Sequence, residues 1–430
     1  MNLTPLEPWI ENKIDHADLA DYQLRKLNET LHWAVTKSRF YRRQLARTPI
    51  DLASLADLTR LPLTTAEDVR ADPLAFVCVS QDDIQRVVTL DDANFPLTTL
   101  TTSGTTGQPK RLFFTRDDQE LTIDFFHVGM STFTAPGDRV LILLPGETPG
   151  SVGDLLATGL QRLGAIPIKH GPVRDAAATL DVIRREKIDV LVGVSTHVLA
   201  LARCPNALKS RLKAVLLSTD HVPHAIKNAI ESVFECTVYN HYGMTEMGLG
   251  GGVDCAARRG YHLREADMYF EIVDPVSGKH LPDGEYGEVI FTTLTRRGMP
   301  LIRYRTGDVS RFIVEPCPCG TRLKTLERIT HRWRGRVPIG VSYLTMADLD
   351  EALFAIDGVL NFTATLIHGV QGDELQLAVK SMDDVDVLVA VKQALSKLPV
   401  LADVTLGVTL IPSIPPSLAK RTLIDRRNHA

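Results

Sequence analysis

The feature that most constrains the fold is a repeated alternation of short apolar runs and amphipathic stretches between about residues 97 and 240. Runs such as DRVLILLPG and LKAVLLS are followed by stretches with helical spacing, such as SVGDLLATGLQRLG and HAIKNAIESVFE. Strands that alternate with helices in this way are typical of a doubly wound, mostly parallel sheet. We therefore predict an α/β fold built around such a sheet.

The segments on either side of this alternation have different patterns. Residues 1 to about 90 are predicted to be helix-rich, since apolar residues recur three and four apart and LTTAEDVRADP has the pattern of a capped helix. Residues 268–313 change to period-two runs separated by turns, which predicts β-hairpins. From about residue 333 the pattern predicts a small α+β module. We expect a large N-terminal domain with a β-rich subdomain, residues 1–332, and a small C-terminal domain, residues 333–430.

Composition excludes several classes of protein. A chain of 430 residues exceeds the usual size of a single core, so two domains are expected. The net charge of −4, from 48 basic and 52 acidic residues, does not point to nucleic acid or an anionic membrane as partner. No apolar run approaches 18 residues, and the N-terminus lacks the apolar core of a signal peptide. Six cysteines are too few for a disulfide scaffold. We expect a cytoplasmic enzyme.

The stretch TLTTSGTTGQPKRLFFT, residues 99–115, is rich in small polar residues. Gly104 and Gly107 allow backbone N–H groups to turn inward, and Lys110 adds a positive charge. Hydroxyl donors come from Thr101, Thr102, Ser103, Thr105 and Thr106. This set suits a polyphosphate, although the spacing differs from that of the GxxxxGK[ST] nucleotide loop. A polar hairpin turn between two strands is the alternative interpretation.

Two further motifs carry groups that suit a nucleotide. VYNHYGMTEMG, residues 238–248, sets the aromatic Tyr242 beside a glycine and the acid Glu246, which could stack on a purine and hold Mg²⁺ against phosphate. MPLIRYRTGDVSRF is predicted to end a strand in Thr-Gly-Asp, where Asp308 could accept hydrogen bonds from two ribose hydroxyls. Taken singly, Tyr242 also fits a core or rim aromatic, and Asp308 also fits a turn former.

In this order and at these separations, TSGTTGQPK, YGMTE and YRTGD resemble the adenylate-forming superfamily of acyl-CoA synthetases, luciferases and peptide-synthetase adenylation domains. Within it, GEYGEVIFTTLTRRGMPLIRYRTGD, CPCG and SIPPSLAKRTLID are most similar to the phenylacetate–CoA ligase family. The resemblance extends from the N-terminal helices to the last twenty residues. It implies an AMP-binding N-terminal domain and a small mobile C-terminal domain. It also implies ATP-dependent activation of a carboxylic acid as an acyl-adenylate, then thioester formation with CoA and release of AMP and pyrophosphate.

The resemblance also implies roles for individual residues around the nucleotide. The loop that covers the ATP phosphates is matched by Thr102, Ser103, Gly104, Thr105, Thr106, Gly107 and Lys110. In YGMTE, Tyr242 would pack on adenine with Gly243 and Met244 beside it, while Thr245 and Glu246 would face phosphate and Mg²⁺ as catalytic residues.

Three single residues complete the implied site. Asp308 would accept the ribose hydroxyls, Arg332 would follow the ribose toward the hinge, and Lys420 would reach the α-phosphate as a catalytic residue. A fixed cation is needed there because a carboxylate that attacks a phosphate brings two anions together. An exposed lysine in the tail is the alternative interpretation of Lys420.

Departures from the family pattern leave the acyl acceptor open. Lys420 follows Ser-Leu-Ala where the family has Ser-Glu-Gly, and HRWRGRVPIGVSYLTM lacks the acids of the family's hinge, although Gly335 can still bend. CoA is the favoured acceptor. The alternative is an adenylate-forming enzyme that does not use CoA and instead transfers to an amine or carrier protein, or transfers AMP to a deazaflavin-type hydroxyl. A degenerate, non-enzymatic scaffold is disfavoured because the motifs survive.

Four residues predict a metal site. Cys317 and Cys319 form the knuckle CPCG, and Cys255 and His262 lie upstream with six residues between them. Three thiolates and one imidazole make a tetrahedral set for a structural Zn²⁺. The alternative is unbound cysteines near a turn. The other cysteines, in apolar surroundings, are predicted to lie in the core: Cys78, Cys204 and Cys236.

The sequence does not identify the acid. By position, ETPGSVGD, residues 147–154, and FFHVG, residues 125–129, are expected near the acyl group, but neither carries a charge that would select a side chain. The resemblance favours an aromatic acid. We expect a small-molecule carboxylic acid as partner, no nucleic acid and no membrane, and leave a homodimer open.

Overall fold

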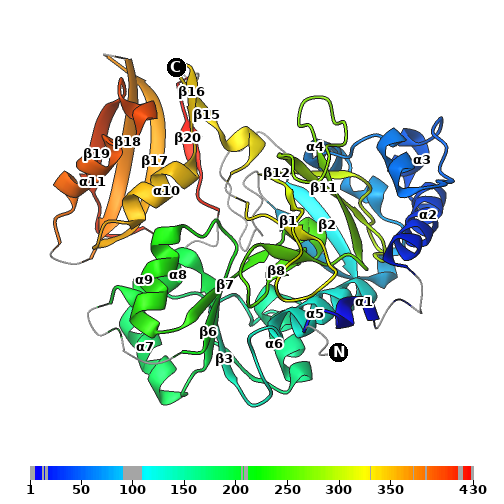
Figure 1. The fold of residues 1–430 in the computed structure, drawn as a ribbon, viewed down its shortest axis with the longest axis horizontal. Helices are drawn as coiled ribbons and strands as arrows, with labels where there is room; N and C mark the ends of the chain where they lie inside the picture. Colours follow the sequence, from blue (N-terminus) through cyan, green and yellow to red (C-terminus); the bar gives the residue numbers. More distant parts are fainter. Residues whose placement is uncertain are drawn as a thin grey trace. The chain divides into compact units, whose positions relative to one another are not determined.

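A computed structural model describes residues 5–11, 14, 18–90, 109–204, 207, 212–329, 331–370, 372–382, 385–414 and 420–427 (Figure 1). The chain divides into two compact units that interleave in sequence. Unit 1 contains Met1–Gly137, Pro145–Pro167 and His241–Arg328, and unit 2 contains Asp138–Leu144, Ile168–Asn240 and Ile329–Ala430. The predicted domain boundary at residues 332/333 stays a prediction.

The N-terminal part of unit 1 is helical, as predicted. Its helices are α1 (Pro8–Glu11), α2 (Leu19–Lys37), α3 (Arg39–Gln44), α4 (Ala66–Ala71), α5 (Arg116–Met130) and α6 (Val152–Leu163). In α2, residues at helical spacing such as Leu27, Leu31 and Ala34 are buried. Thr65 and Asp68 form a capping box at the start of α4, which confirms the predicted capped helix.

The strands of unit 1 are mainly antiparallel. They are β1 (Ile84–Leu90) paired with β2 (Lys110–Thr115), the three-stranded sheet β10 (Met268–Val273), β11 (Gly287–Thr293) and β12 (Tyr304–Ser310), and the ladder β8 (Gly252–Asp254), β9 (Tyr261–Leu263), β14 (Thr325–Leu326) and β13 (Phe312–Ile313). β10 and β11 form an antiparallel hairpin with Phe270 opposite Phe291, which confirms the hairpin predicted for this segment.

The predicted strand end at Thr-Gly-Asp is wrong. β12 continues through Asp308 to Ser310, and its pairing with β11 shifts register between Glu288 and Ile290. Gly307, with φ of 76°, lets the strand bulge, and the Asp308 N–H donates to Thr306 Oγ1 at 3.0 Å. The predicted strand end is therefore a bulge, and Asp308 lies within a paired strand.

Unit 2 contains the parallel strands that the alternation predicted. Strands β3 (Arg139–Ile142), β5 (Val190–Val194), β6 (Ala214–Ser218) and β7 (Thr237–Tyr242) pair in parallel, with α7 (Ala176–Arg185), α8 (Ser195–Ala202) and α9 (His224–Phe234) in the connections. The last two residues of β7 and the first two of β4 (Ile166–Lys169) belong to unit 1. Every residue of β5 is buried, as expected for a strand covered on both faces. The predicted α/β fold is confirmed.

The C-terminal segment of unit 2 is the predicted α+β module. It has the ribbon β15 (Val337–Ile339) and β16 (Ser342–Leu344), and a four-stranded sheet in the order β19 (Thr405–Leu410), β18 (Gly372–Ser381), β17 (Val359–Gly369) and β20 (Leu423–Asp425). Its helices are α10 (Met346–Phe354) and α11 (Leu388–Leu395). Within unit 2 one apolar cluster joins the parallel strands to this module; its members include Val215, Phe234, Leu353, Phe362 and Leu377.

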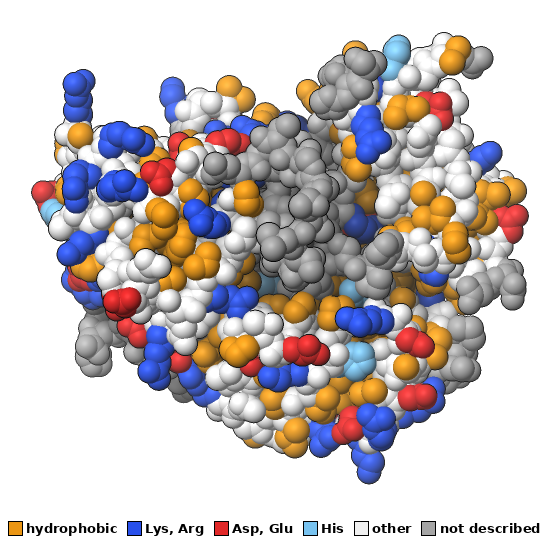
Figure 2. Space-filling model, turned by 180° about the vertical axis from the view of Figure 1, so that it is seen from behind, with side chains coloured by type: hydrophobic (Ala, Val, Ile, Leu, Met, Phe, Trp, Pro, Cys, Tyr) orange, Lys and Arg blue, Asp and Glu red, His pale blue; other side chains and the backbone are white. Residues whose placement is uncertain are grey.

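Short 3₁₀ turns lie between these elements, at Leu55–Arg60, Pro73–Phe76, Gln81–Asp83, Thr245–Met247, Trp333–Gly335 and Pro399–Leu401. On the face drawn in Figure 2, Lys and Arg side chains lie among Asp and Glu side chains. Within the residues that the structure describes, no helix is both long enough and apolar enough to span a bilayer.

Candidate functional site

The predicted site residues fall into three groups by location. The loop residues Thr102, Ser103, Gly104, Thr105, Thr106 and Gly107 lie outside the described residues. In unit 1 lie Lys110, Tyr242, Gly243, Met244, Thr245, Glu246, Asp308, Cys255, His262, Cys317 and Cys319. Arg332 and Lys420 belong to unit 2.

Lys110 and Glu246 form a fully buried ion pair. Lys110 opens β2 and is 0% exposed, while Glu246 lies on the turn Thr245–Met247 and is 1% exposed. The Lys110 Nζ donates to Glu246 Oε1 and, at 3.3 Å, to the hydroxyl of Tyr304, which itself donates to Glu246 Oε1 at 3.1 Å. A buried pair of this kind is tolerated only when further hydrogen bonds orient it, and Tyr304 supplies them.

A second contact joins the motifs YGMTE and YRTGD. The hydroxyl of Tyr242, the last residue of β7, donates to Asp308 Oδ2 at 3.1 Å. The ring of Tyr242 also stacks on Tyr261 with centroids 5.5 Å apart. Both Tyr242 and Asp308 are buried. The aromatic residue of one motif and the acid of the other are therefore held in one place, although they are 66 positions apart in sequence.

Glycines let the loop after β7 fold tightly. A Cβ on Gly243 would lie 2.2 Å from the carbonyl oxygen of Leu249, and one on Gly250 would lie 2.1 Å from the ring of Phe125. Gly248 has φ of 69° and donates its N–H to Thr245 O at 2.9 Å. The loop can therefore hold Thr245 and Glu246 only with glycine at these positions.

Two buried side chains fix this loop from outside. Arg296 donates to the backbone carbonyl of Glu246 at 2.6 Å, and Thr122 donates to that of Gly248 at 2.8 Å. Burial lowers the pKa of Arg296 to about 10. Asp118, on α5, accepts the backbone N–H of the residue after Arg296 at 3.1 Å. Neither Arg296 nor Thr122 was predicted from sequence, and the only signal was the position of Arg296 within the stretch that carries the family resemblance.

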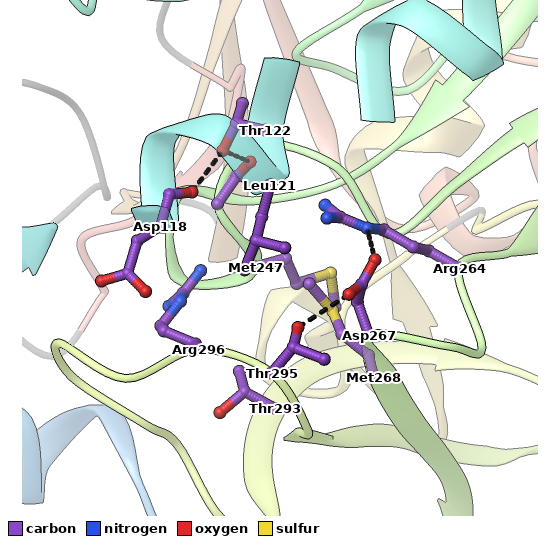
Figure 3. A pocket seen from close by; sticks show the side chains of 11 residues that line it. Asp118, Leu121, Thr122, Met247, Arg264, Asp267, Met268, Thr293, Thr295 and Arg296 are labelled. Atoms are coloured by element: carbon purple, nitrogen blue, oxygen red, sulfur yellow. Dashed lines mark hydrogen bonds and ion pairs between the residues drawn. The ribbon is translucent and has the colours of Figure 1, made fainter. Parts of the chain in front are cut away.

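A small cavity lies beside this loop (Figure 3). It is lined by Asp118, Leu121, Thr122, Met247, Gly248, Arg264, Asp267, Met268, Thr293, Thr295 and Arg296. Arg264 donates to Asp267 at 2.6 Å, and Thr295 donates to the other carboxylate oxygen of Asp267 at 2.7 Å. The volume of ≈ 10 Å³ holds about one water molecule, so this cavity is not the acyl pocket.

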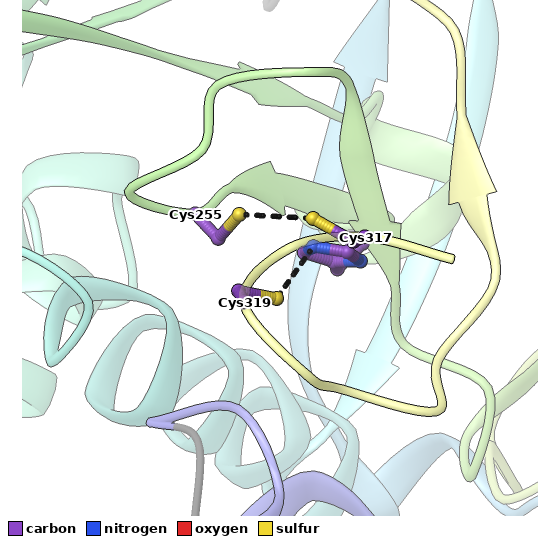
Figure 4. A group of neighbouring side chains, drawn as sticks. Cys255, Cys317 and Cys319 are labelled. Carbon is purple, nitrogen blue, oxygen red and sulfur yellow. Dashed lines mark hydrogen bonds between the residues drawn. The ribbon is translucent and has the colours of Figure 1, made fainter. Parts of the chain in front are cut away.

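The four predicted metal ligands come together (Figure 4). Cys255 follows β8, His262 lies in β9, and Cys317 and Cys319 lie between β13 and β14. Their ligating atoms all lie within 4.8 Å of one another. The sulfurs of Cys255 and Cys317 are 3.6 Å apart, and Cys319 Sγ is 3.4 Å from His262 Nε2. Two sulfurs bound tetrahedrally at ~2.3 Å from Zn²⁺ would be about 3.8 Å apart, so the spacing fits a shared ion.

Backbone geometry and a second hydrogen bond orient these ligands. In the pairing of β9 with β14, His262 lies opposite Thr325, and its Nδ1 is 3.2 Å from Thr325 Oγ1. That bond leaves Nε2 directed at the cysteines, as in many metal sites. Gly320, with φ of 82°, closes the knuckle by donating to Cys317 O at 3.0 Å.

Burial favours the neutral forms of two of these ligands. It raises the pKa of the Cys255 thiol to about 12 and lowers the pKa of the His262 imidazole to about 4. A bound cation would reverse the preference of the thiol because it stabilises the thiolate. Of the other cysteines, Cys78 is buried as predicted, whereas Cys204 and Cys236 are only half-buried.

The two site residues of unit 2 lie beside the predicted hinge and near the end of the chain. Arg332 directly precedes the turn Trp333–Gly335 and accepts the Gly335 N–H at its carbonyl oxygen at 3.0 Å. Arg336, directly after this turn, stacks on Trp333 at 3.8 Å and on Tyr343 at 4.9 Å from the ring centroids. Lys420 is half-buried and lies three residues before β20.

Comparison with known proteins gives a consistent result. A family model described as AMP-binding enzyme matches residues 37–294. The chain is 29% identical over 332 residues to a phenylacetate-coenzyme A ligase of Thermus thermophilus, covering 73% of this chain and 70% of the relative. It is 28% identical over 345 residues to the phenylacetate-coenzyme A ligase of Escherichia coli, covering 76% and 74%. A crystal structure of 2-hydroxyisobutyryl-CoA ligase in the postadenylation state is similar in fold, with a TM-score of 0.79 at 22% identity over 97% of this chain and 91% of the other.

Proposed function

Because the chain belongs to the AMP-binding enzyme family, we propose that it is an AMP-forming acid–CoA ligase. It uses ATP to convert a carboxylic acid into an acyl-adenylate, then passes the acyl group to CoA and releases AMP and pyrophosphate. The relatives named phenylacetate-coenzyme A ligase support this assignment over about three quarters of the chain. The main structural support for this function is that the motifs contact one another: Tyr242 donates a hydrogen bond to Asp308, and Lys110 forms an ion pair with Glu246.

The nucleotide would be bound by the motif residues of unit 1. Tyr242 offers its ring to adenine, and Asp308 accepts the ribose hydroxyls. The loop from Thr102 to Gly107 and Lys110 provides donors for the phosphates. Because the hydroxyl of Tyr242 already holds Asp308, ring and carboxylate are oriented before ATP arrives, which lowers the entropic cost of binding.

Thr245 and Glu246 would hold Mg²⁺ together with the phosphates. The donor set fits this ion, since Mg²⁺ is usually bound by one or two carboxylates plus substrate phosphates. Lys110 and Tyr304 both bind Glu246 Oε1, so the carboxylate is held in one orientation. When bound, the ion would offset the charge of the phosphates. Lys110 places a fixed positive charge beside Glu246, at the end of the phosphate loop.

Lys420 would act in adenylation, with Arg332 following the ribose. The lysine serves two anions at once, the attacking carboxylate and the α-phosphate, and a preorganised cation of this kind stabilises charge that develops in the transition state. Because Lys420 acts on the reacting groups while unit 1 supplies the contacts to adenine, loss of Lys420 should slow chemistry more than it weakens ATP binding.

Cys255, His262, Cys317 and Cys319 would hold one structural Zn²⁺. Three sulfurs and an imidazole nitrogen within 4.8 Å of one another fit a closed tetrahedral site with no open position for substrate. None of the four belongs to a nucleotide motif. The ion would tie the loop after β8 to the loop after β13 and so stabilise unit 1.

The remaining parts of the reaction are the acyl acceptor and the acid. We favour CoA and an aromatic acid, in keeping with the phenylacetate-coenzyme A ligases. The changed hinge supports the alternative, an adenylate passed to an amine or a carrier protein or AMP passed to a deazaflavin-type acceptor, because Arg336 stacked on Trp333 replaces the hinge acids. The proposed setting is the cytoplasm, where free cysteines persist.

The test is a screen for acid-dependent pyrophosphate release. Purified protein, ATP and Mg²⁺ are mixed with single aromatic and aliphatic acids, with and without CoA. We expect one group of acids to trigger release, with continued turnover only when CoA is present. Lys420→Ala serves as the inactive control. If no acid gives more release than this control, the proposed function is wrong.

A further inference from the structure

Arg421, the residue directly after Lys420, is held by two carboxylates. Its two terminal nitrogens donate to Asp350 Oδ1 and Oδ2 at 2.7 and 2.8 Å, in the bidentate geometry that a guanidinium favours. Its Nε donates to Asp220 Oδ2 at 3.2 Å, and its backbone N–H donates to the same oxygen at 3.3 Å. Side chain and backbone of residue 421 are therefore both fixed.

The faces of the guanidinium are also covered. The group lies 4.7 Å from the ring centroid of Phe354 and 5.5 Å from that of Phe362, and both rings are buried. The contacts come from separate elements of unit 2: the loop after β6 supplies Asp220, α10 supplies Asp350 and Phe354, and β17 supplies Phe362. A long side chain with so many contacts has little rotational freedom.

This arrangement is poorly suited to stability alone. Two carboxylates share one guanidinium, the side chain of Asp350 is only 2% exposed, and burial raises the pKa of Asp350 to about 7. Buried ion pairs often contribute no more to stability than well-packed apolar side chains would. What they do provide is one defined geometry, and here that geometry fixes the backbone beside Lys420.

Asp220, Asp350 and Arg421 all belong to unit 2. Asp220 lies in the part with the parallel strands, and Asp350 lies in the C-terminal module, which one apolar cluster joins to those strands. Arg421 therefore bridges two parts of one compact unit, and both parts fix the backbone beside Lys420.

We propose that Arg421 is a positioning residue that fixes Lys420 for adenylation, with Asp350 and Asp220 as the two carboxylates that hold it. The inference rests on the proposed function, in which Lys420 acts on the α-phosphate. It predicts that loss of Arg421 damages one half-reaction and spares the other.

The experiment measures the two half-reactions separately in four variants. Acid-dependent exchange of pyrophosphate into ATP reports adenylation, and thioester yield from a pre-made acyl-adenylate with CoA reports the second step. The variants are Lys420→Ala, Arg421→Gln, Asp220→Asn and the control Arg427→Gln. Arg427, six residues after Arg421, is a matched control because it also binds two carboxylates, those of Asp373 and Asp425.

Arg421→Gln should lower the maximal exchange rate on the order of 10-fold to 100-fold, with an unchanged KM for ATP and thioester formation within about twofold of the wild type. Asp220→Asn keeps the buried Asp350 pair and so guards against misfolding. It should slow exchange by a smaller factor and leave thioester formation within about twofold of the wild type. Arg427→Gln should change neither rate.

The outcomes separate this inference from the proposed function. If Lys420→Ala abolishes exchange while Arg421→Gln and Asp220→Asn exchange normally, the positioning role is wrong and the role of Lys420 stands. Equal damage to both half-reactions in Asp220→Asn overturns the positioning role as well, since it indicates a general loss of structure. If Lys420→Ala exchanges normally, the proposed role of Lys420 fails and this inference fails with it.

Discussion

Replacing Tyr304 with phenylalanine removes one hydroxyl from the buried Lys110–Glu246 pair and leaves the ring in place. The hydroxyl accepts from Lys110 at 3.3 Å and donates to Glu246 at 3.1 Å, so two hydrogen bonds to charged groups are lost. Each such bond contributes about 1.5–3 kcal/mol when buried. Because Lys110 and Glu246 still satisfy each other, we expect the lower end for the two bonds together, a loss of about 3 kcal/mol in the free energy of unfolding of unit 1.

The matched control is an exposed tyrosine–glutamate pair. Tyr286 is 59% exposed, and its hydroxyl donates to Glu327 at 2.5 Å. In water a lost bond is replaced, so Tyr286→Phe should cost less than about 0.5 kcal/mol. Urea unfolding of both variants, followed by tryptophan fluorescence and by circular dichroism, measures the difference. If Tyr304→Phe lowers the free energy of unfolding no more than Tyr286→Phe does, the buried hydrogen bonds of Tyr304 to Lys110 and Glu246 contribute no more than an exposed one. That result would refute the prediction.

Three further predictions use other parts of the chain. Purified protein should contain about one zinc per chain, and Cys317→Ser should lose it while the control Cys204→Ser keeps it; equal zinc in both would rule out the four-ligand site. Lys420→Ala should slow adenylation on the order of 10²-fold or more while ATP binding stays nearly intact, as measured by exchange and by equilibrium titration with ATP; weakened ATP binding would contradict this. Burial raises the pKa of Glu265 to about 7, so the contribution of Glu265 to stability is present below its unfolded pKa and is lost as pH rises through 7. The free energy of unfolding of Glu265→Gln, measured in urea, should therefore rise relative to that of the wild type by up to about 3 kcal/mol between pH 5 and pH 8. A difference between the two proteins that does not change with pH would refute this prediction.

The features that were predicted correctly depend on local patterns. The buried strand β5 and the capped helix α4 follow from short runs of residue types, because burial on both faces requires continuous apolar residues and a helix start requires a capping pair. The meeting of Cys255 with Cys317 across 62 positions was also predicted, since thiols are rare enough to stand out. The ion itself stays a prediction.

The features that sequence reasoning missed depend on contacts between distant segments. Nothing local marks Arg296 as the group that holds the Glu246 carbonyl, 50 positions away. Tyr304 lies inside a recognised motif, yet its role follows only from its hydrogen bonds to Lys110 and Glu246. Asp308 also fitted a turn former, whereas it lies within a paired strand beside a bulge at Gly307. In the sequence, Arg421 is one of several charges near the end of the chain, and only the structure shows its hydrogen bonds to Asp220 and Asp350.

The most direct test of the account is a single-turnover experiment with an acid found in the screen. Enzyme in excess is mixed with ATP, Mg²⁺ and the acid, and the products are separated by mass spectrometry before and after CoA is added. The account predicts enzyme-bound acyl-AMP and free pyrophosphate before CoA, and equal amounts of acyl-CoA and AMP after it. Formation of ADP and phosphate, or an acyl-AMP that CoA never consumes, would contradict it.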